Sequence, residues 1–348
     1  MHTVSRRFML NVAIATPFLF VRPALAKLAA IEESGFVGIG GIDQWISIRG
    51  SDMRNPVILF LHGGPAEAQS PFLKEFLPWE ESFTVINWDQ RGAGKTFGRN
   101  GLKTPDMTVG RMAKDVVEIA EYANRKLHTR KVILVGHSWG AVLALHAVKL
   151  RPDLFSALVG TGQPVNWSLS VEDLERFARQ RAMEAGDDTA LANLDEASKL
   201  PVTDFKRLRA TNKWRMSESD VAYLNIQRNF VGPPPLPTTG DVADWIAGGD
   251  FSGPLLWPTI TSFDARSFAP ALPIPFYVIQ GRDDHVVSYR AAKDYLDQVR
   301  APAKAFIPID DGHFACFTDP AQFLTALRTR VGGLAATAQA KSAFAILG

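Results

Sequence analysis

The chain has 348 residues, of which 46% are hydrophobic, and its 38 lysines and arginines nearly balance its 36 aspartates and glutamates. This length suits one large α/β domain with an insertion better than two unrelated domains. The net charge of +2, with basic and acidic residues interspersed rather than striped, indicates neither a nucleic-acid partner nor a polybasic membrane surface.

The first 26 residues have the composition of an export signal. Ser5-Arg6-Arg7 precedes an apolar run from Phe8 to Val21, and Ala24-Leu25-Ala26 follows as a small-residue cleavage site. The paired arginines favour the twin-arginine export machinery, with the general secretory route as the alternative. The apolar run is interrupted and is shorter than the ~20 residues that span a bilayer, so no stable membrane anchor is expected. The sequence therefore predicts a periplasmic or secreted protein after removal of the signal peptide.

After this leader, alternating apolar and amphipathic stretches predict an α/β fold with a mostly parallel central sheet and helices on both faces. The pattern predicts strands near 36–39, 45–48, 56–61, 83–88, 131–135, 155–160, 273–280 and 303–309, and a clear amphipathic helix at 110–127. From about Val165 to Pro270 the pattern changes to charged helical stretches, which predict a helical cap inserted over the sheet edge. The expected organisation is a signal peptide (1–26), a core (27–164 and 271–335), a helical cap (165–270) and a C-terminal tail (336–348).

The pentapeptide Gly136-His137-Ser138-Trp139-Gly140 lies between a predicted strand and a helix-like run. A serine at such a tight strand-to-helix corner needs glycine two positions away on each side, because larger side chains would clash there. An ordinary glycine-rich turn is the alternative, but the strand before it and the helix after it favour a nucleophile elbow. The pattern predicts Ser138 as a nucleophile.

A serine nucleophile needs an imidazole to accept its proton and a carboxylate to orient that imidazole. His313 follows a predicted strand on a loop and is the expected base, whereas His285 is interpreted as a neighbour of the acid. Adjacent residues at a strand end point in different directions, so only one of two neighbouring aspartates can face the histidine. We predict Asp284, with Asp283 as the fallback and Asp311 as a third possibility.

An oxyanion hole is expected from two backbone N–H groups, one of Trp139 and one from the loop His62-Gly63-Gly64-Pro65 after the strand at 56–61. The two glycines let the backbone approach a substrate closely. We predict Gly64 as the second donor, with Gly63 next.

Two other interpretations are rejected. Asp283, Asp284 and His285 have the chemistry of metal ligands, but consecutive residues rarely converge on one ion, so neither a metal nor another cofactor is expected. Arg91-Gly92-Ala93-Gly94-Lys95-Thr96 imitates the end of a phosphate-binding loop, but Asp89 stands where the first glycine is required.

Three segments together resemble the proline iminopeptidase-like branch of the α/β-hydrolases. They are His62-Gly63-Gly64-Pro65, Asn87-Trp88-Asp89-Gln90-Arg91-Gly92-Ala93-Gly94 and Gly136-His137-Ser138-Trp139-Gly140. The resemblance covers most of residues 35–330 and implies the α/β-hydrolase fold, a triad of Ser138, Asp284 and His313, and an oxyanion hole lined by Gly64 and Trp139.

The chain departs from this branch in two ways. The loop continues as Pro65-Ala66-Glu67 where the aminopeptidases usually have a further glycine, and the Trp-Glu cap segment that holds the free amino group of their substrates is missing. The resemblance therefore implies the fold but leaves the substrate open.

Four tryptophans fall in the predicted cap, and Trp167 and Trp214 are the candidates for contact with substrate. The others are expected to form the core of the cap, and the cap glutamates Glu172, Glu175 and Glu218 to lie on solvated helix faces rather than to bind an ammonium group. The expected activity is that of a serine hydrolase acting through an acyl-enzyme on an ester or amide of a small, partly apolar molecule or short peptide. The alternatives are release of N-terminal proline from peptides and, in another class, a non-catalytic binding protein on a hydrolase scaffold.

Overall fold

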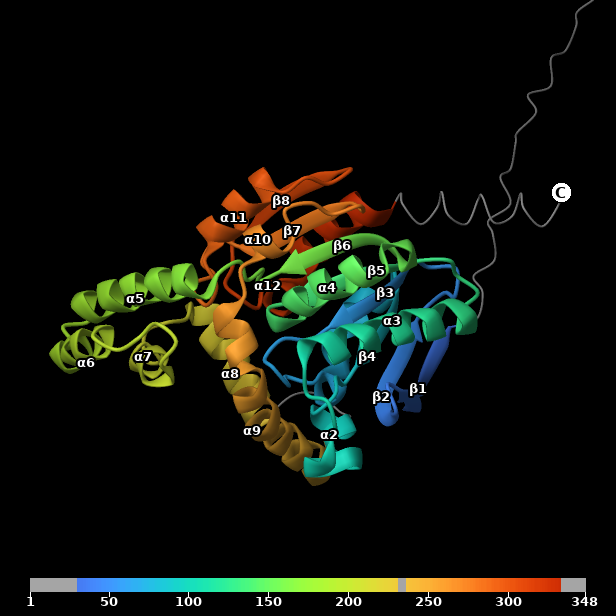
Figure 1. Cartoon of the computed structure of the whole chain (residues 1–348), viewed down its shortest axis with the longest axis horizontal. Helices are drawn as coiled ribbons and strands as arrows, with labels where there is room; N and C mark the ends of the chain where they lie inside the picture. The colour runs from blue at the N-terminus through green and yellow to red at the C-terminus, as the bar shows by residue number, and fades with distance from the viewer. Residues whose placement is uncertain (1–29, 231–235, 333–348) are drawn as a thin grey trace, which may run out of the picture.

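The computed structural model of the chain describes residues 30–230 and 236–332. The predicted signal peptide at 1–26 and C-terminal tail at 336–348 lie outside the described residues. Eight strands form one sheet in the order β1-β2-β4-β3-β5-β6-β7-β8 (Figure 1). The strands are β1 (Ile31–Ile39), β2 (Ile42–Gly50), β3 (Val57–Leu61), β4 (Thr84–Trp88), β5 (Val132–His137), β6 (Phe155–Thr161), β7 (Phe276–Gly281) and β8 (Lys304–Ile309).

The sheet is antiparallel at one edge and parallel elsewhere. β2 pairs antiparallel with both β1 and β4, and every other neighbouring pair is parallel. β1 and β2 are longer than the sequence predicted, because they pair as a continuous hairpin from Ile31 opposite Gly50 to Ile39 opposite Ile42. The mostly parallel sheet is confirmed.

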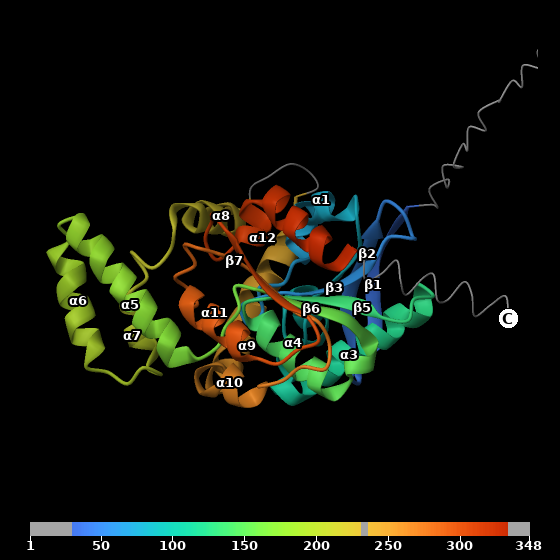
Figure 2. The same ribbon diagram turned by 90° about the horizontal axis from the view of Figure 1, so that it is seen from above.

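Helices cover both faces of this sheet, since the strands are buried on both sides. In β3, Leu59 and Leu61 face one hydrophobic core while Ile58 and Phe60 face the other. The first core is closed by α3 (Val109–Lys126), α4 (Trp139–Leu150) and α11 (Tyr289–Gln298), and the second by α1 (Leu77–Glu80) and a helix at 320–332. Figure 2 shows these two layers on opposite sides of the sheet. The shorter helices are η1 (Ser70–Phe76), α2 (Gly94–Asn100), η2 (Gly101–Lys103), η3 (Pro152–Leu154) and α12 (Ala315–Thr318).

A helical cap lies between β6 and β7, as predicted. It consists of α5 (Trp167–Glu184), α6 (Asp188–Ser198), α7 (Phe205–Ala210), α8 (Glu218–Asn229), α9 (Thr239–Ser262) and α10 (Ala265–Phe268). Each of these helices begins after a side chain that accepts a backbone N–H from its first turn, the usual way in which a helix start is capped: Asn166, Asp187, Asp204, Ser217, Thr238 and Asp264. In Figure 1, α5, α6 and α7 extend away from the sheet, whereas α8 and α9 lie close to the core.

The segment that imitates a phosphate-binding loop joins the core to the cap. The Asp89 carboxylate accepts the backbone N–H groups of Ser70 and Lys95 at 3.2 and 2.9 Å, and the Lys95 ammonium pairs with Asp241 of α9. Ser252 of α9 donates to the Gly92 carbonyl at 2.7 Å. These contacts account for the segment structurally, without a nucleotide. No helix within residues 30–230 and 236–332 combines the length and apolar character needed to cross a membrane.

Candidate active site

Ser138 lies at a strained corner between β5 and α4. Its backbone has φ 53° and ψ −120°, a conformation that side chains other than glycine rarely adopt. The two flanking glycines are required by close approach: a Cβ on Gly136 would lie 2.6 Å from the Cα of Ala141, and one on Gly140 would lie 2.0 Å from the Leu61 carbonyl oxygen. The corner therefore has the geometry expected of a nucleophile elbow.

His313 and Asp284 form a buried pair. Nδ1 of His313 donates to the Asp284 carboxylate, with distances of 2.9 and 3.0 Å to its two oxygens, and the two residues are 3% and 1% exposed. Asp284 is held in place by the backbone N–H groups of Val286 and Val287, each at 3.1 Å.

The other two acidic candidates lie elsewhere. The Asp283 side chain is exposed, and the Asp311 carboxylate accepts hydrogen bonds from Ser219 and from the backbone N–H of Gly312. The structure thus brings Asp284, and not Asp283 or Asp311, to the imidazole. His285 stacks on Phe177 with 3.6 Å between ring centroids. Within the described residues, no group of three or more His, Cys, Asp and Glu side chains could hold a metal ion.

Burial by itself lowers the pKa of His313, but nearby negative charge outweighs it. The charge and hydrogen bond of Asp284, followed by the charges of Asp220 and Glu67, raise the pKa above its ordinary value of 6.5. His137 packs beside His313 with 4.8 Å between ring centroids, and its pKa is lowered well below the usual range, mainly by burial. Because His137 is neutral, its Nε2–H can donate to the His313 carbonyl at 3.2 Å.

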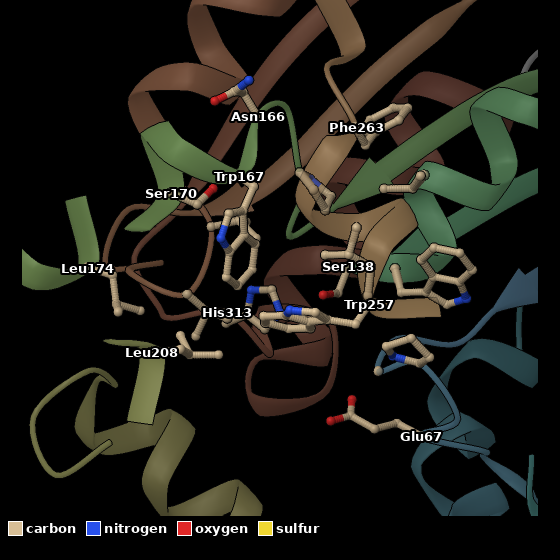
Figure 3. A pocket seen from close by; sticks show the side chains of 18 of the residues that line it. Glu67, Ser138, Asn166, Trp167, Ser170, Leu174, Leu208, Trp257, Phe263 and His313 are labelled. Atoms are coloured by element: carbon tan, nitrogen blue, oxygen red, sulfur yellow. The ribbon is translucent and has the colours of Figure 1, made fainter. Parts of the chain in front are cut away.

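Ser138 and His313 open into one cavity of about 220 Å³ between the sheet edge and the cap. In Figure 3, these two side chains lie near its centre, with Trp167 above them and Glu67 below. Gly64 and Trp139 also line the cavity. Trp139 is the first residue of α4, so its backbone N–H has no acceptor within the helix. Gly63 does not line the cavity, but a Cβ there would lie 3.2 Å from that of Ser138.

The cap contributes most of the apolar wall, and its tryptophans divide differently from the prediction. Trp167 and Trp257 line the cavity, with Leu174, Leu208, Met216, Ile260 and Phe263. Trp214 does not, because its indole lies beside Asp187 and donates to that carboxylate at 3.1 Å. Glu172, Glu175 and Glu218 are also absent from the lining, and Glu175 pairs with Arg207.

Two residues that the sequence analysis did not single out hold the loop after β3. The Gln90 amide donates to the His62 carbonyl at 2.9 Å and accepts from the Trp139 indole at 3.0 Å. Burial lowers the pKa of His62 to about 4, so the ring is neutral; Nε2 accepts from the backbone N–H of Gln90 and Nδ1 donates to the Gly63 carbonyl. Gln90 thus connects the two expected oxyanion donors, and its place in the segment 87–94 was the signal available in the sequence.

Glu67 and Arg215 bring opposite charges to the cavity wall. Burial raises the pKa of Glu67, against the opposing effects of His313, Arg215 and Arg228. Burial also lowers the pKa of Arg215, helped by the like charge of Arg228. The sequence analysis noted Glu67 as a departure from the aminopeptidases and did not predict that it faces the site.

A family model described as the alpha/beta hydrolase fold matches residues 56–320. The chain belongs to the α/β-hydrolase family. This match confirms the fold class that the sequence motifs implied, and it covers the elbow, the Asp284–His313 pair and the cap of this α/β-hydrolase.

Similar proteins carry aminopeptidase names. A probable aminopeptidase, YbaC of Bacillus subtilis (strain 168), is 27% identical over 325 residues, which cover 88% of this α/β-hydrolase and 97% of the relative. A proline iminopeptidase of Thermoplasma volcanium is 24% identical over 233 residues, 64% of this chain and 76% of that protein. The crystal structure of a proline iminopeptidase-related protein from Thermus thermophilus is 21% identical with a TM-score of 0.59, covering 88% of this chain and 99% of that chain, and shares the fold.

Proposed function

We propose that this α/β-hydrolase is a serine hydrolase that cleaves an ester or amide bond through an acyl-enzyme. The observation that carries the proposal is the buried Asp284–His313 pair, which opens into the same cavity as the strained corner at Ser138. A serine in an ordinary turn needs neither a carboxylate-bound imidazole beside it nor a cavity above it.

In the proposed reaction, Nε2 of His313 removes the proton from Oγ of Ser138 as this oxygen attacks the substrate carbonyl. Asp284 holds Nδ1–H and stabilises the imidazolium that forms. The backbone N–H groups of Gly64 and Trp139 donate to the oxyanion. His313 then protonates the leaving alcohol or amine, and a water molecule, deprotonated by His313, releases the acid and frees Ser138.

The cavity supports a small, partly apolar substrate. Its volume of about 220 Å³ limits the part of the substrate that can be enclosed, and its wall combines aliphatic and indole side chains with a few polar groups. Trp167 and Trp257 are the proposed apolar contacts on the cap side.

Aminopeptidase action is the second candidate, and Glu67 is the observation that favours it. Oε2 of Glu67 and Cβ of Ser138 lie 3.3 and 3.2 Å from the position that a Cβ on Gly63 would occupy, so the carboxylate is close to the nucleophile. The free amino group of a peptide lies next to the scissile carbonyl of its first residue, within reach of such a carboxylate. The names of the similar aminopeptidases support this candidate.

The first experiment compares p-nitrophenyl acetate and butyrate with proline-p-nitroanilide and its N-acetyl form, using the wild-type protein and Ser138→Ala. Ester turnover that is lost in the variant, without prolyl amide turnover, supports an esterase-type hydrolase. Preference for the free-amine prolyl amide over its acetylated form supports the aminopeptidase. Failure of Ser138 to react with a fluorophosphonate in the folded protein refutes the serine hydrolase and supports the non-catalytic binding protein.

We also propose, from residues 1–26, that the protein is exported by the twin-arginine machinery and acts in the periplasm or outside the cell. Replacing Arg6 and Arg7 with lysine should then retain the protein in the cytoplasm. Cell fractionation with N-terminal sequencing, expected to begin at Lys27, tests both the route and the cleavage site.

A further inference from the structure

A buried carboxylate of the cap holds the loop that carries His313. Asp220, in the first turn of α8, accepts the backbone N–H of His313 at 2.9 Å and that of Phe314 at 3.0 Å, one on each carboxylate oxygen. The side chain is fully buried although it lies 93 residues away from His313 in the chain. Hydrogen bonds to an ionised acceptor are about twice as strong as neutral ones, so this contact fixes the loop firmly.

The contact depends on a glycine in the loop. A Cβ on Gly312 would lie 2.3 Å from Oδ2 of Asp220 and 2.3 Å from Oγ of Ser217, so any side chain there would push the start of α8 away. Gly312 is not among the glycines with positive φ. Its lack of a side chain therefore serves the approach of α8 rather than an unusual backbone conformation.

A second contact holds the same helix against the core. The Tyr223 hydroxyl of α8 donates to the Glu75 carboxylate of η1. The Tyr223 ring stacks on Phe317 with 5.5 Å between centroids and 4° between planes. Figure 1 shows α8 close to the sheet, whereas α5, α6 and α7 extend away from it. The two contacts make α8 the part of the cap that sits directly on the histidine loop.

Asp220 also acts on the imidazole through its charge. Within the described residues, no lysine or arginine forms an ion pair with Asp220; burial raises its pKa, while the charge of His313 and the two backbone N–H groups lower it. The groups that face His313 are Asp284 after β7, Asp220 on α8, Glu67 after β3 and the neutral His137 on β5. Asp220 is thus one of three carboxylates that favour the protonated imidazole.

We propose that Asp220 is a positioning residue, which makes the placement of the His313 base depend on docking of the cap helix α8. The inference rests on the serine hydrolase proposed above. It means that the base is held from the core by Asp284 and from the cap by Asp220. A cap that lifts α8 off the loop would release two backbone N–H groups next to the imidazole and would misplace Nε2.

The test is Asp220→Asn, with Glu218→Gln as the matched control. The control removes the same charge from the same helical turn, but the Glu218 side chain is 93% exposed. An amide has one acceptor oxygen, so in Asp220→Asn one of the two loop N–H groups loses its partner. We expect kcat for the best substrate of the panel to fall at least about tenfold, the effect of losing one charge-assisted hydrogen bond, with KM nearly unchanged.

The pH profile separates positioning from general destabilisation. Loss of the Asp220 charge lowers the pKa of His313, so the acid limb of kcat/KM should move to lower pH in Asp220→Asn and stay in place in Glu218→Gln. A folded Asp220→Asn with wild-type kcat and an unmoved acid limb overturns the proposal. If this variant does not fold, Gly312→Ala displaces α8 while keeping the carboxylate, and wild-type kcat in that variant overturns the proposal instead.

A measurement without turnover distinguishes failure of this inference from failure of the proposed function. The His313 ring is titrated by NMR in the wild-type protein and in Asp220→Asn. A lower pKa in the variant supports the coupling even if no substrate of the panel is cleaved, and an equal pKa overturns it even if the wild-type protein is an active hydrolase.

Discussion

Nδ1 of His313 lies 2.9 Å from the Asp284 carboxylate, and neither side chain is more than 3% exposed. Because the carboxylate selects the tautomer in which Nε2 can accept a proton, Asp284→Asn should lower kcat by about 10³- to 10⁴-fold with little loss of stability. Asp283→Asn is the control, since this adjacent side chain is exposed. Steady-state kinetics with thermal melts checks both variants, and equal losses in the two would contradict the assignment.

The raised pKa of His313 predicts the pH dependence of the wild-type protein. The imidazole must be neutral to accept the Ser138 proton, so kcat/KM should rise with pH along an acid limb whose midpoint lies above 6.5. Glu67→Gln removes one of the charges that raise this pKa, and its limb should lie at lower pH. A limb below 6.5 in the wild-type protein would argue against His313 as the base.

The segment 87–94 contains a buried ion pair that should dominate local stability. Arg91 donates to Asp115 at 2.8 Å and neither side chain is exposed. Asp115→Asn leaves the guanidinium buried without its charge partner and should cost about 3–5 kcal/mol in the free energy of unfolding. Asp43→Asn, which breaks the exposed pair with Arg99, should cost about 0–1 kcal/mol. Urea denaturation of the three proteins decides whether the difference exists.

Glu75 should make the stability depend on pH. Burial raises its pKa to about 7, against the opposing hydrogen bond from Tyr223 and charge of Lys74, whereas the unfolded value is near 4.5. Since the folded protein prefers the protonated carboxyl, the stabilisation is fully present below about 4.5 and is lost as the pH rises through about 7. In thermal melts, the stability difference between Glu75→Gln and the wild-type protein should shift in favour of the variant across this range. A difference independent of pH would show that Glu75 titrates normally.

The fold was largely predictable because its signals are local. A buried parallel strand is a short apolar run, and a nucleophile elbow needs glycines at fixed spacing around the serine, so β3, β5 and the corner at Ser138 were readable from neighbouring residues. β1 and β2 were predicted too short, since their outer residues are ordered by pairing with each other rather than by their own pattern.

By itself, the sequence determined the sheet, the helical insertion, and the order of Ser138, Asp284 and His313 along the chain. Only the tertiary structure decided that Asp284 reaches the imidazole, that Trp257 rather than Trp214 lines the cavity, and that Glu67 faces it. It alone brought Asp220 onto the histidine loop. These contacts join segments that are far apart in the chain, and they depend on how the cap packs over the sheet edge, which no local periodicity encodes.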